Sequence, residues 1–251
     1  SLVSDAKIYR SIHETLYGWD KNERDVSQIL GALQLFKLSQ PIPAVLSLVR
    51  SYKNGVIKYG KLRDALLSIE KFHFVFTAVT SSRSSGGISA MYSSFARKIF
   101  EVDNSQNASA EIGILVKKLR ARIPSYDEFK VAFKEIYYTN SRSKQKNLVR
   151  YILRKISEYM CYKYPVDFDD LTIEHIQPQA SIGSTWTEES IGRLGNLILI
   201  DQEMNGKLST KSFIEKISIL KSANYSIPEF LKSKNDWTPS DVESHTNDMA
   251  E

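Results

Sequence analysis

Residues 172–179 read Thr-Ile-Glu-His-Ile-Gln-Pro-Gln, residues 193–200 read Arg-Leu-Gly-Asn-Leu-Ile-Leu-Ile, and residues 205–209 read Asn-Gly-Lys-Leu-Ser. The short apolar run after Gly195-Asn196 predicts a turn that leads into a buried strand. Further on, apolar residues at 213, 217 and 220 have helical spacing, and Ser209 or Thr210 is the expected N-cap. We therefore expect a strand, a loop and a helix that pack around one site.

His175 and Glu174 are the residue types that hydrolysis of a phosphodiester requires. Imidazole has an unperturbed pKa that suits removal of a proton from water near neutral pH. Glu174 can supply a carboxylate to a hard cation beside the charged phosphate. Neighbouring side chains of a strand face opposite ways, so we expect a bend or bulge at this pair. Taken singly, His175 is more typical of a surface histidine beside a proline-containing turn, and Asn196 and Asn205-Gly206 are ordinary turn residues.

The sequence before residue 165 is mostly helical, because apolar residues recur there at the spacing of one helix face. Ser125-x-x-Glu128 predicts a capping box, and a long helix follows through residues 148–160. Periodicity stops at the acidic turn 165–170. We predict a helical spacer or scaffold at 1–165 and a small α+β module at 166–251. The other predicted helical windows are 26–36, 62–76 and 88–99.

The composition excludes several classes of protein and favours a cytoplasmic one. No run of about 18 apolar residues could cross a membrane. The first residues lack the basic start and apolar stretch of a signal peptide. The single cysteine, Cys161, fits a reducing compartment and is expected to be buried. The net charge of +5 is compatible with a polyanionic partner. The glycines at 86–87 lack the spacing of a phosphate-binding loop, so residues 81–87 are expected to be a plain connection.

The order Glu-His-Ile-x-Pro-Gln, Trp, Leu-Gly-Asn-Leu, Asn-x-x-Leu-Ser, Phe-x-x-Lys resembles the DUF1524 family. These are the HNH-type (His-Me finger) nuclease modules of GmrSD-like modification-dependent restriction enzymes and of phosphorothioate-sensing defence proteins related to SspE. The resemblance runs from about residue 142 to Trp237. It implies a ββα-metal fold for the module at 166–251, preceded by a helical region.

The resemblance also implies a role for each motif residue. His175 would be the general base, Asn196 would brace the loop that carries it, and Asn205 would be a metal ligand. Glu174 would be the second metal ligand, and Lys216 would contact phosphate. Because asparagine is a weak neutral oxygen ligand, the ion is expected to be Mg²⁺ or Mn²⁺ rather than zinc.

A basic run lies just ahead of the motif, and Lys146, Arg150 and Arg154 share one face of its helix. This face is expected either to follow a DNA backbone or simply to be solvated. Such nucleases usually begin with a DUF262-type sensor domain, whose Asp-Gly-x-x-Arg signature does not occur here. We therefore expect the sensor to lie outside this chain. Val242-Glu243-Ser244-His245 also departs from the closing Ile-x-x-Arg of the family.

Two functions follow from this sequence. The first is a metal-dependent DNA endonuclease or nickase module of a bacterial modification-dependent restriction protein that defends against phage. The alternative is a non-catalytic DNA-binding module that retains the nuclease fold, with residues 1–165 as a docking scaffold for the separate sensor domain. The sequence predicts no particular oligomeric state.

Overall fold

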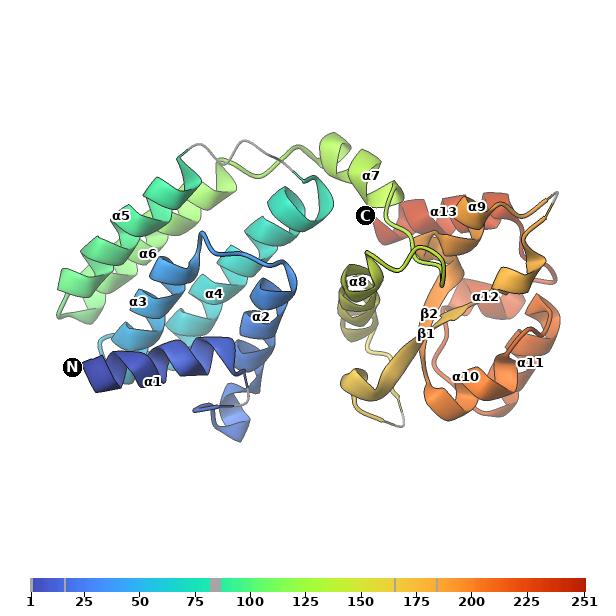
Figure 1. The fold of residues 1–251 in the computed structure, drawn as a ribbon, viewed down its shortest axis with the longest axis horizontal. Helices are drawn as coiled ribbons and strands as arrows, with labels where there is room; N and C mark the ends of the chain where they lie inside the picture. Colours follow the sequence, from blue (N-terminus) through green and yellow to red (C-terminus); the bar gives the residue numbers. More distant parts are fainter. Residues whose placement is uncertain (1, 16, 82–86, 165, 184) are drawn as a thin grey trace. The chain divides into compact units, whose positions relative to one another are not determined.

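The computed structural model describes residues 2–15, 17–81, 87–164, 166–183 and 185–251. These residues form thirteen α-helices and one two-stranded antiparallel sheet (Figure 1). The prediction of a mainly helical chain with a small amount of strand in its C-terminal part is confirmed. The chain forms two compact units, residues 1–129 and 130–251. The connection predicted at 81–87 falls largely outside the described residues.

The described residues of the first unit form helices and no strand. Each of the predicted windows corresponds to a helix whose apolar face is buried. The helix in the window 62–76 ends at His73 and continues directly into a π-helical segment, Phe74–Val79. The capping box is present, because the backbone N–H of Ser125 donates to Glu128 Oε2 at 2.8 Å. The helices are α1 Leu2–His13, α2 Arg24–Leu35, α3 Ile42–Lys53, α4 Tyr59–His73, α5 Ile88–Glu101, α6 Ser105–Arg120 and, across the boundary, α7 Tyr126–Lys134.

The second unit is organised around the antiparallel pair of β1, Leu171–His175, and β2, Leu197–Asp201. The division between the units lies earlier than the boundary predicted near residue 165, because α8 packs against β2 and so belongs with the sheet. The remaining helices are α8 Lys146–Tyr159, α9 Glu188–Gly192, α10 Gln202–Leu208, α11 Phe213–Ser222, α12 Glu229–Ser233 and α13 Pro239–Met249.

Local geometry in the second unit differs from expectation at three places. No bulge interrupts β1: Glu174 pairs with Ile198 and His175 with Leu197 in regular register, so their side chains take opposite faces. The helix expected from residue 213 is preceded by a separate short helix, α10. The N-cap of α11 is Ser212, whose backbone N–H donates to Glu215 Oε2 at 2.9 Å, and not Ser209 or Thr210.

Cys161 is exposed, so the prediction that it is buried was wrong. It follows the end of α8 with a φ of 55°, where the chain turns away from the apolar helix face. The tryptophans at 186 and 237 are buried in the core of the unit, as expected of packing anchors. Gly195 allows α13 to approach closely, because a Cβ at this position would lie 2.3 Å from the carbonyl oxygen of Val242.

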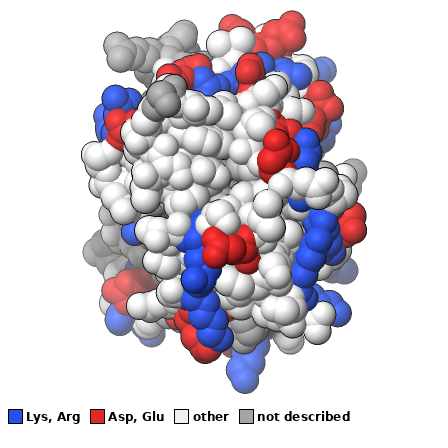
Figure 2. Space-filling view, turned by 90° about the vertical axis from the view of Figure 1, so that its right-hand side faces the viewer, with Lys and Arg blue, Asp and Glu red and all other residues white. Residues whose placement is uncertain are grey.

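Charge is divided unevenly between the two units. Residues 1–129 contain 18 of the 34 lysines and arginines but only 12 of the 29 aspartates and glutamates. The second unit is therefore nearly neutral, and the first carries the positive excess. Figure 2 shows the side of the molecule on which α11 and α12 lie, where both signs occur next to each other around a broad uncharged area.

Candidate active site

His175 ends β1 and is held in one orientation by a backbone carbonyl. Its ring is only 5% exposed, and Nε2 lies 3.0 Å from the carbonyl oxygen of Tyr138. A carbonyl oxygen can only accept, so this contact assigns the proton to Nε2 and leaves the lone pair on Nδ1. The Gln179 amide nitrogen is 3.5 Å from Nδ1, at the limit of hydrogen bonding. Burial lowers the pKa of His175 to about 4, so the ring is neutral at pH 7.

The Tyr138 carbonyl belongs to a segment, residues 137–145, that we call the strap. The Tyr138 N–H donates to the Gly192 carbonyl at 2.8 Å, and the Asn140 N–H donates to Gln179 Oε1 at 2.9 Å. Thr139 Oγ1 donates to a Glu188 carboxylate oxygen at 3.0 Å. A Cβ at Gly192 would lie 2.9 Å from the Thr139 methyl and 3.1 Å from the Tyr138 carbonyl oxygen, so the close approach of the strap depends on this glycine.

The strap is the part of the site that the sequence did not reveal. The module was predicted to start at residue 166, whereas the acceptor for His175 lies 37 residues before that histidine. A backbone carbonyl can come from any residue type, so no sequence pattern marks it.

Asn196 is fully buried and uses its whole side-chain amide. Nδ2 donates to the carbonyls of Gln177 at 3.0 Å and Ile191 at 2.7 Å. Oδ1 accepts from the Gln177 N–H at 2.8 Å and from Trp237 Nε1 at 3.0 Å. These hydrogen bonds fix the backbone at Gln177, two residues after His175. This geometry is what a brace of the histidine-bearing loop requires.

Glu174 lies on the opposite face of β1 and forms a buried ion pair with Lys216. Lys216 is 2% exposed, and its Nζ is 2.5 Å from Glu174 Oε1 and 2.7 Å from the carbonyl oxygen of His175. Burial raises the pKa of Glu174 and lowers that of Lys216, while their mutual attraction favours the charged pair. The predicted phosphate contact of Lys216 does not fit this place, because the ammonium is out of solvent and its bonds are directed inward.

Asn205 joins α10 to β1. Its Nδ2 donates to Thr172 Oγ1 at 3.0 Å and to the Ile173 carbonyl at 3.4 Å. Among the residues that the structure describes, no three or more His, Cys, Asp or Glu side chains are arranged to hold a metal ion. The carboxylate of Glu174, the other predicted ligand, is already neutralised by an ammonium group. In this arrangement Glu174 therefore does not fit as a ligand of a divalent cation.

The predicted basic face of α8 is mostly bound to its own unit. Arg150 donates to the Asp169 carbonyl at 3.0 Å, and Arg154 pairs with Glu158 at 2.9 Å. Lys146 Nζ lies 5.7 Å from the centre of the Tyr138 ring in the strap. Arg150 thereby fastens α8 to residues 168–169, and the charge of Arg154 is paired within its own helix, so neither arginine is free for a DNA backbone.

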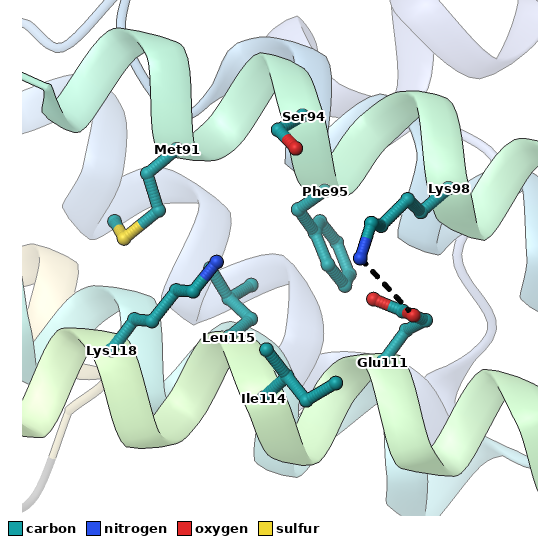
Figure 3. Close-up of a pocket in the computed structure, with 8 residues that line it drawn as sticks. All are labelled: Met91, Ser94, Phe95, Lys98, Glu111, Ile114, Leu115 and Lys118. Atoms are coloured by element: carbon teal, nitrogen blue, oxygen red, sulfur yellow. Dashed lines mark ion pairs between the residues drawn. The ribbon is translucent and has the colours of Figure 1, made fainter.

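A hollow between α5 and α6 lies in the first unit and holds none of the predicted site residues (Figure 3). Lys98 on α5 and Glu111 on α6 form an ion pair across it at 3.5 Å. Its volume of about 10 Å³ is no more than one water molecule needs. It carries no candidate site.

Comparison with known families bears directly on the motif. Residues 123–251 match the family model of the C-terminal domain of GmrSD restriction endonucleases. The chain belongs to this family. No curated protein matches the chain. The matched GmrSD domain begins before the strap, so it contains both His175 and the carbonyl that orients it. None of the described helices is long and apolar enough to span a membrane.

Proposed function

We propose that the GmrSD C-terminal domain of this chain is a His-Me finger nuclease that hydrolyses DNA phosphodiester bonds, with His175 as the general base. The observation that carries the proposal is the fixed tautomer of His175, which directs a basic nitrogen to one side of a buried ring. The chain order β1, β2, α10, with α10 packed against both strands, supports the ββα arrangement. Membership of a restriction endonuclease family supports DNA as the substrate.

In the proposed mechanism His175 Nδ1 takes a proton from a water molecule, and the resulting hydroxide attacks phosphorus as the bond to the leaving sugar oxygen breaks. The leaving oxygen departs with the electron pair of that bond and takes a proton from solvent water. The Tyr138 carbonyl favours this step, because its hydrogen bond to Nε2–H strengthens when the ring becomes positive. The water takes the place of the Gln179 amide against Nδ1. Gln179 can remain anchored meanwhile through its other amide atom, which accepts from the Asn140 N–H.

Glu174, Lys216 and Asn196 act as positioning residues in this proposal. Lys216 binds both the Glu174 side chain and the His175 carbonyl, and it thereby secures the end of the strand that carries the base. Asn196 secures the chain on the other side of His175. The requirement for Mg²⁺ or Mn²⁺ rests on the family resemblance, and no step is assigned to the ion because Glu174, which is paired with Lys216, does not fit it in this arrangement.

The test is incubation of supercoiled plasmid with the full chain and Mg²⁺ or Mn²⁺, beside an EDTA control. Conversion to open-circular or linear DNA should be lost in His175→Ala and retained in His13→Ala, which removes an exposed histidine. Equal cleavage by both variants would refute the role of His175. If the chain alone leaves plasmid intact, the assay is repeated with the longer parent protein, since we propose that an N-terminal DUF262-type sensor domain selects the DNA.

One observation favours the second candidate, a DNA-binding module without activity. His175 is nearly inaccessible to solvent and Glu174 is neutralised by an ion pair, and both features are typical of a site that has lost catalytic activity. Under this alternative the parent protein retards DNA in a gel with either metal and never cuts it, and His175→Ala changes neither result.

A further inference from the structure

We infer that a cation-lined groove between α4 and α6 of the first unit binds the phosphate backbone of double-stranded DNA. This inference rests on the proposed function for the choice of DNA, but it concerns a different part of the chain from the nuclease motif. The groove has a volume of about 450 Å³. Lys61 of α4 and Lys117 and Arg120 of α6 line it together.

These three side chains are exposed and have no carboxylate partner among the described residues. The groove contains one acidic residue, Asp64, whose carboxylate pairs with the neighbouring Arg63 at 2.9 Å. The three cations therefore leave a positive excess inside the groove. A lysine or arginine that is free of an internal partner is able to displace condensed counterions from DNA phosphates.

The basic residues of the second unit are less available to DNA than those of the groove. The arginines of α8 are bonded to acidic residues and carbonyls of their own unit, and the second unit as a whole has slightly more acidic than basic residues. The positive excess of the chain thus lies in the first unit, and the groove gathers part of it on two adjacent helices. Contacts of this kind fix a duplex without reading its sequence.

One lining residue of the groove has no side chain and faces open space. Gly113 of α6 lies there, and a Cβ added to it would meet no atom within 4 Å. A side chain introduced at this position enters the groove without disturbing the fold. This makes Gly113 a site at which charge in the groove can be changed selectively.

The first experiment compares two triple variants of the full chain. Lys61→Ala, Lys117→Ala and Arg120→Ala together remove the groove cations. The control removes the same charge from exposed positions outside the groove, namely Lys7→Ala, Lys21→Ala and Lys71→Ala. Binding of a fluorescein-labelled duplex is measured by anisotropy across a salt series in EDTA, so that cleavage does not enter.

We expect the groove variant to bind more weakly and to lower the slope of log affinity against log salt by about 2.7, since each phosphate contact contributes about 0.9. The control variant should have the same slope as the unsubstituted chain. Equal slopes in the two triple variants would overturn the inference. So would failure of the unsubstituted chain to bind duplex at low salt. Because His175 is untouched and no cutting is measured, these outcomes are independent of those of the plasmid assay.

A second pair of variants guards against loss of folding as an explanation. Gly113→Glu places a carboxylate in the groove and should weaken DNA binding, whereas Gly113→Ala adds only a methyl group and should not. Both should have the circular dichroism spectrum of the parent. Unchanged binding by Gly113→Glu would count against the groove.

Discussion

Replacement of Lys216 by methionine tests whether the buried ion pair secures the site. The substitution keeps most of the side-chain volume but leaves the carboxylate of Glu174, which is 7% exposed, without a counter-charge. Breaking a buried pair from one side costs about 3–5 kcal/mol, because the remaining charge is still desolvated. The His175 carbonyl also loses its donor. We therefore expect the free energy of unfolding of the second unit to fall by about 3–5 kcal/mol.

The assay is urea unfolding followed by tryptophan fluorescence in a Trp19→Phe background. Trp186 and Trp237 then report the second unit alone, since Trp19 is the only tryptophan of the first. Adding Glu174→Gln to Lys216→Met removes the stranded charge and should recover roughly 2 kcal/mol of the loss.

The matched control is Lys207→Met, which breaks a pair with Glu203 whose side chains are 56% and 80% exposed. Exposed pairs contribute little, so this variant should unfold with the parent. If Lys216→Met unfolded at the same urea concentration as Lys207→Met, the reasoning that Lys216 stabilises the site would be refuted.

Three further predictions concern the same unit. Gly195→Ala should lower the free energy of unfolding by about 3 kcal/mol, because its Cβ would overlap α13. Gly206→Ala on α10 should raise the free energy of unfolding by about 1 kcal/mol, because its Cβ meets open space and alanine favours a helix. Similar urea midpoints for the two variants would contradict this prediction. Gly192→Ala should displace the Tyr138 carbonyl and reduce the cleavage rate while DNA affinity, measured in EDTA, stays at the parent value; an unchanged rate would argue against the strap. The pKa of His175 is about 4 when folded and about 6.5 when unfolded, so the unfolded chain binds more protons within this window. The contribution of His175 to stability should therefore be complete above pH 6.5 and fall by at most about 1.4 kcal/mol per pH unit towards pH 4. Burial also lowers the pKa of His245, so the test is that the loss of stability between urea titrations at pH 7 and pH 5 is smaller in His175→Asn than in the unsubstituted chain.

The helices of the first unit could be predicted because their signal is local. The apolar residues of α2 and α4 recur along one face of each helix, and that spacing alone indicates which side is buried. The ends of elements were less predictable. Ser209, Thr210 and Ser212 are all suitable N-caps, and the choice of Ser212 depends on Glu215 three residues later.

Only those parts of the site that are made by characteristic side chains could be predicted from the sequence. The bracing role of Asn196 was predicted only through the family resemblance, because an asparagine before a strand is by itself an ordinary turn residue. The position of Lys216 could not be found in this way, since lysines are rarely buried and pairing with Glu174 brings together residues 42 positions apart. The acceptor of His175 is a peptide group, which has no sequence signature at all.

The bond from His175 to Tyr138 bears on how this domain can be shortened for expression. A fragment that begins after residue 145 retains every letter of the motif, from Glu174 to Lys216, but lacks the peptide group that holds the imidazole. Its ring could then turn about χ2 and exchange tautomers, and inactivity of such a fragment would say nothing about the competence of the motif. A fragment that starts at residue 123, where the family match begins, keeps base and acceptor in one polypeptide.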